Sequence, residues 1–268
     1  MTVPNYSNGW KVPLAFVASS YARPSVVKKY SSDRDRVGLW NSEKIFYERH
    51  LPRNGRLLDL GCGAGRTTFG LLKRGWTDIT GADLSAAMIR SARAFSRKKR
   101  IPVKFVVADG RKLPFKTSSF DSCLFSFNGL MQIPSLKDRV RAMREIRRVL
   151  RPGGRFVFTT HDRERAGEYL DFWKEELVRW KNGSQHPGLH EFGDLIVKDV
   201  DAKGDISFIH IPTRNEVAGW LEAAGFEPIE DLWRPEISGE PERVKKRAAD
   251  CRFWAARKPG RTAHTTSK

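Results

Sequence analysis

The chain has 268 residues, with 49 Lys and Arg against 31 Asp and Glu, and its formal net charge is +18. This length suits one large α/β domain with an insertion and is short for two full domains. A basic chain with only 40% hydrophobic residues invites comparison with disordered proteins. Eight Trp, sixteen Phe and apolar runs such as RLLDL and RFVFTT supply a core, which excludes disorder.

The cysteines and the apolar runs bear on where the protein works. Cys62, Cys123 and Cys251 are odd in number, widely separated and placed in apolar stretches. This pattern disfavours a disulfide scaffold and a zinc site and is typical of a reducing cytosol. No apolar run approaches the roughly 18 residues of a membrane span, and the stretch VPLAFVASSYA is short for a secretory signal and contains Pro13. We therefore expect a cytoplasmic protein with no metal and no membrane contact.

The charge is unevenly distributed along the chain. Residues 161–212 contain 7 Lys and Arg and 11 Asp and Glu, a net charge of −4, whereas the rest contains 42 and 20, a net +22. The positive charge concentrates at residues 90–100, at 137–151 and after Glu240. The apolar spacing in 137–151 predicts a helix whose arginines lie on a solvated outer face. RNA binding by these basic patches is the alternative interpretation.

The elements are predicted in chain order from apolar runs and helix signals. Pro4, Pro13 and Pro24 are expected to interrupt any early helix, so the first helix is predicted from about Gly38 to His50. Short apolar runs then alternate with helical stretches: strands at 56–60, 78–82, 103–107, 120–126 and 154–160, and helices ending at 74 and spanning 85–99 and 137–150. Continuous apolar strands between helices are typical of a parallel sheet buried on both faces, which predicts a doubly wound α/β domain.

The alternation stops after residue 160 for about fifty residues. A helix rich in Glu and Trp is predicted over about 164–181, and LIVKDVDAKGDISFIHI reads as an antiparallel hairpin. The capping box that begins at Thr213 opens a helix over 213–224, followed by a strand from Phe226 and a last strand in CRFWAARK. We expect four parts: an N-terminal lid (1–50), a main domain (51–160 and 213–258), a substrate-cap insertion (161–212) and a flexible basic tail (259–268).

The glycine-rich stretch LLDLGCGAG joins the first strand to the next helix. Glycines there let the backbone approach a ligand closely, and the helix start offers unpaired N–H groups. A dinucleotide fingerprint would read G-x-G-x-x-G, whereas this loop reads G-x-G-x-G with an acid two residues before it. A carboxylate beside the loop suits a cation better than a pyrophosphate. Asp59, Asp83 and Asp109 mark the carboxyl ends of three consecutive strands, where open α/β sheets bind ligands.

These motifs, with GADLS, ADGRKLPF, SFDSCLFSF and VLRPGGRFVF, resemble those of the class I S-adenosylmethionine-dependent methyltransferases over residues 56–160 and less closely over 213–258. The resemblance implies a Rossmann-like sheet of about seven strands, mostly parallel with an antiparallel last strand, and a small α+β cap insertion. It implies S-adenosyl-L-methionine as cofactor and S-adenosyl-L-homocysteine as product. The family's cofactor contacts fall on Asp59, Gly61, Gly63 and Gly65 for the methionine part, Asp83 and Leu84 for ribose and adenine, Asp109 and Gly110 for the adenine edge, and Phe127 near the donor methyl.

The methyl acceptor is less well defined than the cofactor. Residues 125–132, which lie beside the donor methyl in this family, lack the Asn/Asp-Pro-Pro-aromatic pattern used on nucleic-acid bases, and no pair of acids for magnesium follows the fourth strand. We expect in-line methyl transfer to nitrogen or oxygen of a small molecule. The alternatives are a tRNA or rRNA methyltransferase that docks through its basic helices and an inactive cofactor-binding module. The oligomeric state stays open.

Two histidines and several aromatic residues are candidates for the acceptor site. His161 follows the fifth strand and His210 precedes the helix at 213. Both are candidate bases, because imidazole titrates near neutrality, although a structural role is the alternative for both. Aromatic residues of the lid and insertion form either a pocket wall or the insertion's own small core. The pocket candidates are Tyr21, Tyr30, Trp40, Asn128, Tyr169 and Trp173. The negative charge of the insertion favours a neutral or cationic acceptor.

Overall fold

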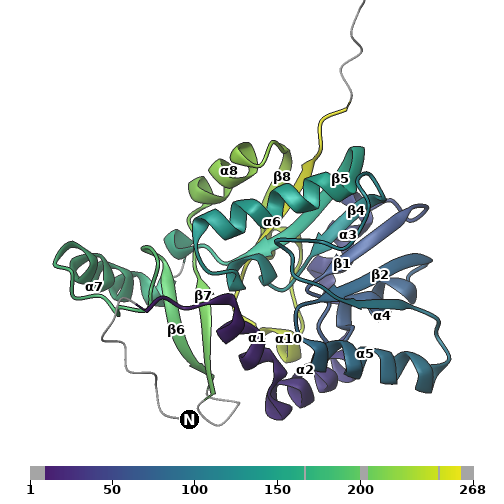
Figure 1. Ribbon diagram of the computed structural model, residues 1–268, viewed down its shortest axis with the longest axis horizontal. Coiled ribbons are helices and arrows are strands. Elements are labelled where there is room, and N and C mark those ends of the chain that lie inside the picture. The colour runs from purple at the N-terminus through teal and green to yellow at the C-terminus, as the bar shows by residue number, and fades with distance from the viewer. Residues whose placement is uncertain (1–9, 166, 200–204, 247, 261–268) are drawn as a thin grey trace, which may run out of the picture.

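A seven-stranded sheet forms the centre of the protein in a computed structural model that describes residues 10–165, 167–199, 205–246 and 248–260 (Figure 1). The strand order is β3-β2-β1-β4-β5-β9-β8. The strands are β1 (Arg56–Leu60), β2 (Asp78–Asp83), β3 (Lys104–Val107), β4 (Phe120–Phe125), β5 (Leu150–Thr160), β8 (Glu227–Trp233) and β9 (Arg252–Arg257). Within this sheet β9 alone runs antiparallel to the other six strands. The predicted doubly wound sheet, mostly parallel with an antiparallel last strand, is confirmed.

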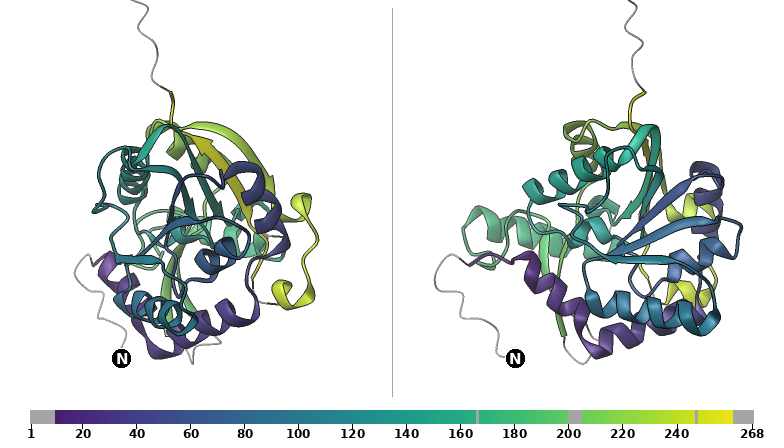
Figure 2. Two further views of the ribbon diagram at one scale, coloured as in Figure 1. Left: turned by 90° about the vertical axis from the view of Figure 1, so that its right-hand side faces the viewer. Right: turned by 45° about the vertical axis from the view of Figure 1, so that its right-hand side comes forward.

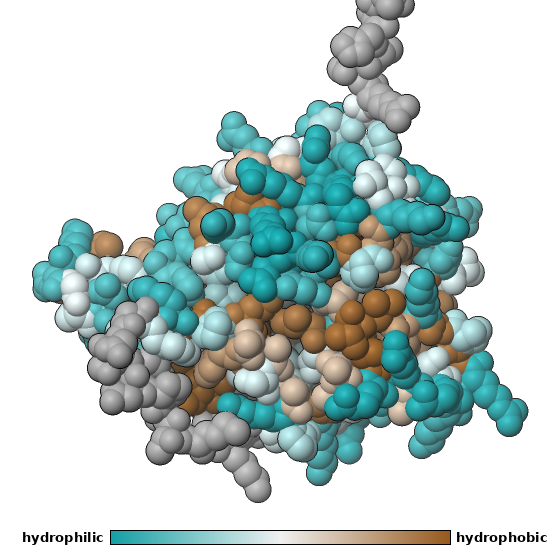
Figure 3. Space-filling view, in the orientation of Figure 1, coloured by the Kyte–Doolittle hydropathy of each residue, from teal (hydrophilic) through white to brown (hydrophobic). Residues whose placement is uncertain are grey.

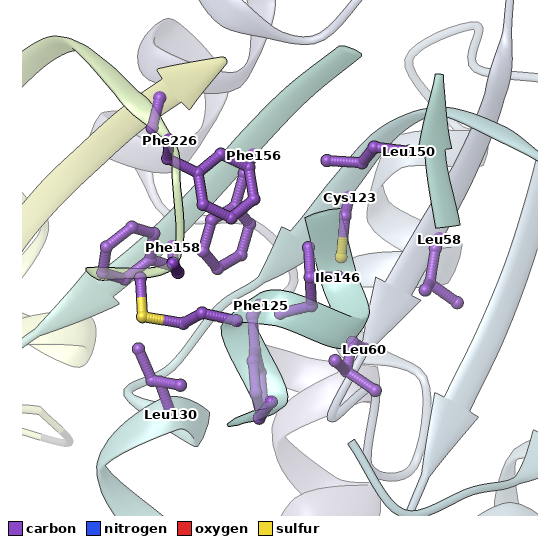
Figure 4. Close-up of a cluster of buried hydrophobic side chains, with 14 of the residues drawn as sticks. Leu58, Leu60, Cys123, Phe125, Leu130, Ile146, Leu150, Phe156, Phe158 and Phe226 are labelled. Carbon is purple, nitrogen blue, oxygen red and sulfur yellow. The ribbon is translucent and has the colours of Figure 1, made fainter. Parts of the chain in front are cut away.

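Helices cover both faces of the sheet because successive strand residues point to opposite sides. They are α3 (Asn41–His50), α4 (Arg66–Leu72), α5 (Ala86–Lys99), α6 (Leu136–Val149), α8 (Arg214–Ala223) and the short α9 (Arg234–Ile237) and α10 (Glu242–Lys245). Leu58 and Leu60 lie in a core cluster with residues of α6 and α8 (Figure 4), whereas Leu57 packs with α3 and α4. The carboxyl ends of the parallel strands are thereby held at one edge of a rigid scaffold.

The N-terminal segment differs from its prediction. Two helices, α1 (Leu14–Ala22) and α2 (Pro24–Arg36), occupy the region in which prolines were expected to prevent helices. Pro13 is the N-cap of α1 and Pro24 is the first residue of α2, where a missing N–H costs nothing and the fixed φ favours a helix. The prediction was wrong because these prolines begin helices instead of interrupting them. Pro4 lies outside the described residues.

The insertion forms a separate small unit beside the sheet. It contains 3₁₀ turns at Arg163–Arg165 and Gly167–Tyr169 where the predicted helix was to begin, then α7 (Leu170–Lys181). The predicted antiparallel hairpin is present as β6 (Asp194–Asp199) and β7 (Asp205–His210). The centre of the hairpin turn, 200–204, lies outside the described residues, as does most of the predicted tail. In Figures 1 and 2 the hairpin lies against α1, where the Ser20 hydroxyl donates to the Ile206 carbonyl at 2.9 Å. The insertion therefore packs on the N-terminal helices.

The arginines of α6 are used differently from the prediction of a solvated face. Arg139 is fully buried, lies 4.9 Å from the centre of the Trp220 ring and donates to the Glu191 carboxylate at 2.5 Å. Three further arginines of this helix donate to carbonyl or carboxylate groups. Arg144 donates to the Ala223 carbonyl, Arg147 donates to the Gly225 carbonyl, and Arg148 donates to the Glu145 carboxylate. Much of the charge of α6 thus fastens the helix to its surroundings.

No helix in the described ranges is long and apolar enough to cross a membrane.

Candidate functional site

A cavity with about 790 Å³ of empty space, part of which is open to solvent, lies at the carboxyl ends of β1 to β4. The sheet side contributes Gly61, Gly63, Asp83, Leu84, Asp109, Gly110 and Phe127, and α1 covers the cavity with Leu14, Val17, Ala18 and Tyr21. Seven of the nine predicted cofactor residues therefore meet around one space. The apolar residues of α1 were not predicted, although their small and apolar pattern at helical spacing would have indicated them once a helix was allowed there.

The glycine loop after β1 takes conformations that side chains disfavour. Gly61 and Gly63 have φ of +65° and +54°, and a Cβ on Gly61 would lie 2.6 Å from the Phe125 ring. Both residues line the cavity. Gly65, with φ of +94°, is the N-cap of α4, and a Cβ there would lie 2.6 Å from the Phe69 ring. Gly65 does not line the cavity, and its positive φ lets the chain enter α4, so a cofactor contact at Gly65 stays a prediction.

Asp83 connects the glycine loop to the end of β2. One carboxylate oxygen accepts the Gly63 N–H and the other accepts the Ser85 N–H, both at 2.8 Å. Burial raises the pKa of Asp83, while these two N–H groups act to lower it. Leu84 follows on the same wall. The carboxylate thus fixes the loop and also borders the cavity.

Asp109 and Gly110 continue this wall at the end of β3. Burial alone would raise the pKa of Asp109, but hydrogen bonds and charge from Arg111 hold it below its usual value. The Arg111 guanidinium lies 2.9 Å from the carboxylate and also binds Asp138 at the start of α6. Asp109 is therefore a fixed, ionised group on the cavity wall.

Asp59 lies beneath the glycine loop. It lines neither this cavity nor a second, smaller one bordered by Trp40 and Arg66. One oxygen accepts the hydroxyls of Thr67 and Thr68 at 2.7 and 2.5 Å, which fastens β1 to α4. The other oxygen is buried without a partner among the described residues. Burial raises the pKa of Asp59 to about 6. A direct role for Asp59 in ligand binding stays a prediction.

A chain of aromatic rings separates the main cavity from a second one of about 510 Å³. The ring centres of Tyr21 and Tyr30 are 5.9 Å apart, those of Tyr30 and Phe127 6.0 Å, and those of Phe127 and Trp40 5.5 Å. Tyr30 and Phe127 border both cavities, and Trp40 borders the second. Three of the six predicted pocket residues thus gather at the site.

Arg66, at the start of α4, supports these rings and was missed by the sequence analysis. Its guanidinium forms a two-pronged ion pair with the buried Glu43 carboxylate at 2.6 Å. It lies 5.2 and 5.3 Å from the centres of the Trp40 and Phe127 rings. Glu43 belongs to α3 and lies more than twenty residues before Arg66, so no local sequence pattern indicates this ion pair.

His161 is held by hydrogen bonds at both ring nitrogens. Nδ1 lies 3.0 Å from the Asp250 carbonyl and Nε2 lies 3.1 Å from the Asn128 amide nitrogen. A carbonyl only accepts, so Nδ1 carries the proton and Nε2 accepts from Asn128. Burial lowers the pKa of His161, which keeps the ring neutral. Neither His161 nor Asn128 lines the two cavities, so the geometry supports the structural alternative for both.

The variant His161→Gln is therefore expected to keep the pH dependence of turnover and to lower the free energy of unfolding by about 1–2 kcal/mol, the cost of one disturbed buried hydrogen bond. Turnover between about pH 6 and 9 and denaturant unfolding check this prediction. His50→Gln is the control, because His50 is also a buried histidine, paired with Glu230 and distant from the cavity lining. Loss of one limb of the pH profile in His161→Gln alone would restore His161 as a base.

The predicted pocket residues of the insertion do not reach the cavity. Tyr169 is 56% exposed, and Trp173 packs edge to face with Phe172 and Phe192 within the insertion. The rings of Phe172, Trp173 and Phe192 form the insertion's own small core, because α7 extends away from the sheet (Figure 1). None of the acids in the described part of the insertion lines the cavity, which removes the charge argument for a neutral or cationic acceptor.

His210 also lies away from the cavity lining. It is 1% exposed, and its Nδ1 lies 2.7 Å from an Asp194 oxygen. Glu191, Asp194 and His210 have the spacing of metal ligands. Asp194 already accepts hydrogen bonds at both oxygens, and Glu191 is paired with Arg139. The group is thus a buried polar network between the insertion and α6.

Comparisons with known proteins agree with this site. Residues 58–158 match the family described as "Methyltransferase domain". The chain is 29% identical over 224 residues to a ubiquinone/menaquinone biosynthesis C-methyltransferase of Rickettsia bellii, covering 76% of this chain and 83% of the relative. Residues 58–158 thus carry a methyltransferase domain, and the resemblance to the class I S-adenosylmethionine-dependent methyltransferases is confirmed.

Solved structures show the same fold. A methyltransferase from Methanosarcina mazei superposes on this methyltransferase with a TM-score of 0.65 at 23% identity, covering 84% of this chain and 100% of the other. The 1,6-didemethyltoxoflavin-N1-methyltransferase of Burkholderia thailandensis, solved with S-adenosylhomocysteine, gives a TM-score of 0.56 at 18% identity, covering 97% and 93%. These likenesses support the sheet topology and the position of the loops at its carboxyl edge.

The cofactor of this methyltransferase is S-adenosyl-L-methionine, and the residues present fit it. Two glycines leave bare backbone on the cavity wall, and the side chains of Asp83 and Asp109 border the same space. The cofactor carries a sulfonium, an amino group and hydroxyls, which carboxylates attract or bind. Asp59 adds a buried oxygen without a partner behind the loop. The polar groups of the site are thus of the kind that the cofactor requires.

Proposed function

We propose that this methyltransferase transfers a methyl group to a small, largely apolar acceptor held beneath α1. The observation that carries the proposal is the composition of the main cavity, in which Leu14, Val17 and Ala18 face a wall containing Phe125 and Ile133. A hydrophobic band crosses the same side of the molecule between α6 and α5 (Figure 3). A concave space lined mainly by apolar side chains favours apolar molecules over large charged ones.

We assign the cofactor to the polar wall of the cavity. Asp83 and Leu84 would bind the ribose and flank the adenine, Asp109 and Gly110 would bind the adenine edge, and the backbone at Gly61 and Gly63 would hold the methionine part. The bound cofactor supplies an electrophilic methyl group on sulfur. The protein contributes by aligning acceptor, methyl carbon and sulfur, which lowers the barrier through positioning. Phe127, between the two cavities, would position the methionine end.

The acceptor needs no protein base in this proposal. Among the described residues that line the main cavity, the only titratable ones are Asp83, Asp109, Tyr21 and Tyr30. Both acids belong to the proposed cofactor wall, and burial raises the pKa of Tyr30 well above its usual value, so this phenol stays neutral. Suitable acceptors are neutral amines and groups that ionise in solution. The relatives named as C-methyltransferases add carbon acceptors to the nitrogen and oxygen acceptors that we expected.

Transfer of labelled methyl groups from S-adenosylmethionine to a panel of small planar phenols, amines and enolisable ketones tests the proposal, after calorimetry has confirmed cofactor binding. We expect turnover with at least one apolar class and none with a matched polyanionic acceptor. Methylation confined to RNA would overturn the small-molecule assignment. Cofactor binding without turnover across the panel and RNA would support the inactive binding module instead.

A further inference from the structure

A broad groove lies on the surface between α2, α4 and α5, outside the cofactor cavity. It encloses about 1540 Å³ of empty space, and its lining contains eight Lys and Arg but a single acid, Asp35. The three helices lie next to one another at the lower right of Figure 1. Lys44 and Arg243 extend the lining onto α3 and α10. A concave surface with so uneven a charge attracts anions.

Among the described residues, five of these cations form no ion pair, although the charges of Lys98 and Lys99 act on Asp35. Arg34, Arg66 and Arg74 are neutralised by Asp35, Glu43 and Glu48, respectively. Lys44 donates only to the Asn41 amide oxygen, and Lys99 lies only over the Phe95 ring at 6.0 Å. In the part of the chain that the structure describes, exposed Lys73, Lys98 and Arg243 form no hydrogen bond or ion pair. This charge is available to a ligand.

The second basic helix identified in the sequence offers a contrast. In α6, Arg139, Arg147 and Arg148 are committed to carbonyl and carboxylate groups of the protein itself. The basic residues at the end of α5 have no such partners across the groove. Of the two basic helices, α5 is the one whose uncommitted cations, Lys98 and Lys99, line the groove, whereas the exposed Lys137 and Arg141 of α6 lie outside it.

The groove also adjoins the site. Val37 and Arg66 line both the groove and the second cavity, and that cavity borders the glycine loop at Gly61 and Gly63. A ligand lying in the groove would therefore lie close to the residues proposed to hold the methionine part of the cofactor. The groove thus offers a docking surface next to the methyl-transfer site and separate from the acceptor cavity.

We propose that this groove binds the phosphodiester backbone of single-stranded nucleic acid. Such a backbone carries one negative charge per nucleotide and follows positively charged grooves. A duplex is stiff over about 150 base pairs and cannot follow a short concave surface as a single strand does. A membrane is a weaker match, because none of the exposed large apolar side chains of the described residues lines the groove. The proposal goes beyond the methyl transfer proposed above and does not require the nucleic acid to be the acceptor.

The test uses a fluorescent oligouridylate of about 12 nucleotides and the full-length protein, with anisotropy measured in roughly 50 to 200 mM KCl. The groove variant combines Lys73→Glu, Lys98→Glu and Arg243→Glu. The control variant combines Lys116→Glu, Lys137→Glu and Lys181→Glu, which changes net charge equally at exposed lysines outside the groove. Calorimetry with S-adenosylmethionine checks that both variants keep the cofactor site.

We expect the groove variant to bind the oligonucleotide at least about tenfold more weakly and to reduce the slope of log affinity against log salt by about 2, since each lost contact removes about 0.7. The control variant should lose less than about threefold. The proposal is overturned by an equal loss in both variants, by no saturable binding at the lowest salt, or by tighter binding to a duplex or to vesicles containing anionic phospholipid. None of these results bears on methyl transfer, so the two proposals fail separately.

Discussion

Asp83→Ala is expected to weaken binding of S-adenosylmethionine by roughly 10- to 100-fold, because hydrogen bonds to a charged group each contribute about 1.5–3 kcal/mol. The substitution removes the carboxylate from the cavity wall and also frees the Gly63 N–H and Ser85 N–H that it accepts. Both effects act on the binding surface. Calorimetric titration with the cofactor measures the change directly.

Asp78→Ala provides the matched control for this experiment. Asp78 begins the same strand, is exposed and lies 3.5 Å from the exposed Arg56, so its removal should leave cofactor affinity unchanged. Thermal unfolding of both variants separates loss of binding from loss of folding. A folded Asp83→Ala protein with the affinity of the unmodified protein would contradict the assignment of this wall to the cofactor.

Arg139→Ala is expected to lower the free energy of unfolding by about 3–5 kcal/mol, the usual cost of removing one partner of a buried ion pair. The change leaves the Glu191 carboxylate without its cation beside Asp194. It also removes the hydrogen bond to the Ile133 carbonyl and the contact with the Trp220 ring. Unfolding in urea, followed by tryptophan fluorescence, measures the loss.

Arg141→Ala controls for the charge and for the helix. Arg141 lies on α6 two residues further along and is exposed, so its replacement should change stability by less than about 0.5 kcal/mol. An equal, small effect of both variants would show that the buried network does not stabilise the junction between α6 and the insertion. Arg139→Met, which keeps much of the side-chain volume, should fall between the two.

The sequence was sufficient where local pattern and topology act together. Apolar runs between helices predicted the parallel sheet, and strand ends in such a sheet meet at one edge. Asp83 and Asp109 could therefore be placed at one site from sequence alone. The capping box of Thr213 and Glu216 was likewise readable, since both of its hydrogen bonds are local.

Contacts between distant segments could not be predicted in this way. Pro13 and Pro24 are compatible with either a break or a helix start, and only packing of α1 over the cavity distinguishes them. The aromatic rings of α7 could have packed on the cavity or within the insertion, and in the structure they pack within the insertion. The groove combines cations from α4, α5 and α10, which are far apart in the chain, so no sequence window contains it.

The position of β9 affects how the protein can fold while it is being synthesised. Five strands, from β3 to β5 in the sheet order, are complete by residue 160, so the half of the sheet that borders the cofactor cavity can assemble early. β9 lies between β5 and β8 and is the last strand in the chain. Until residues 252–257 leave the ribosome, β5 and β8 each lack a neighbour, and unpaired strand edges promote aggregation. The nascent chain is therefore most exposed to misassembly just before its final strand arrives.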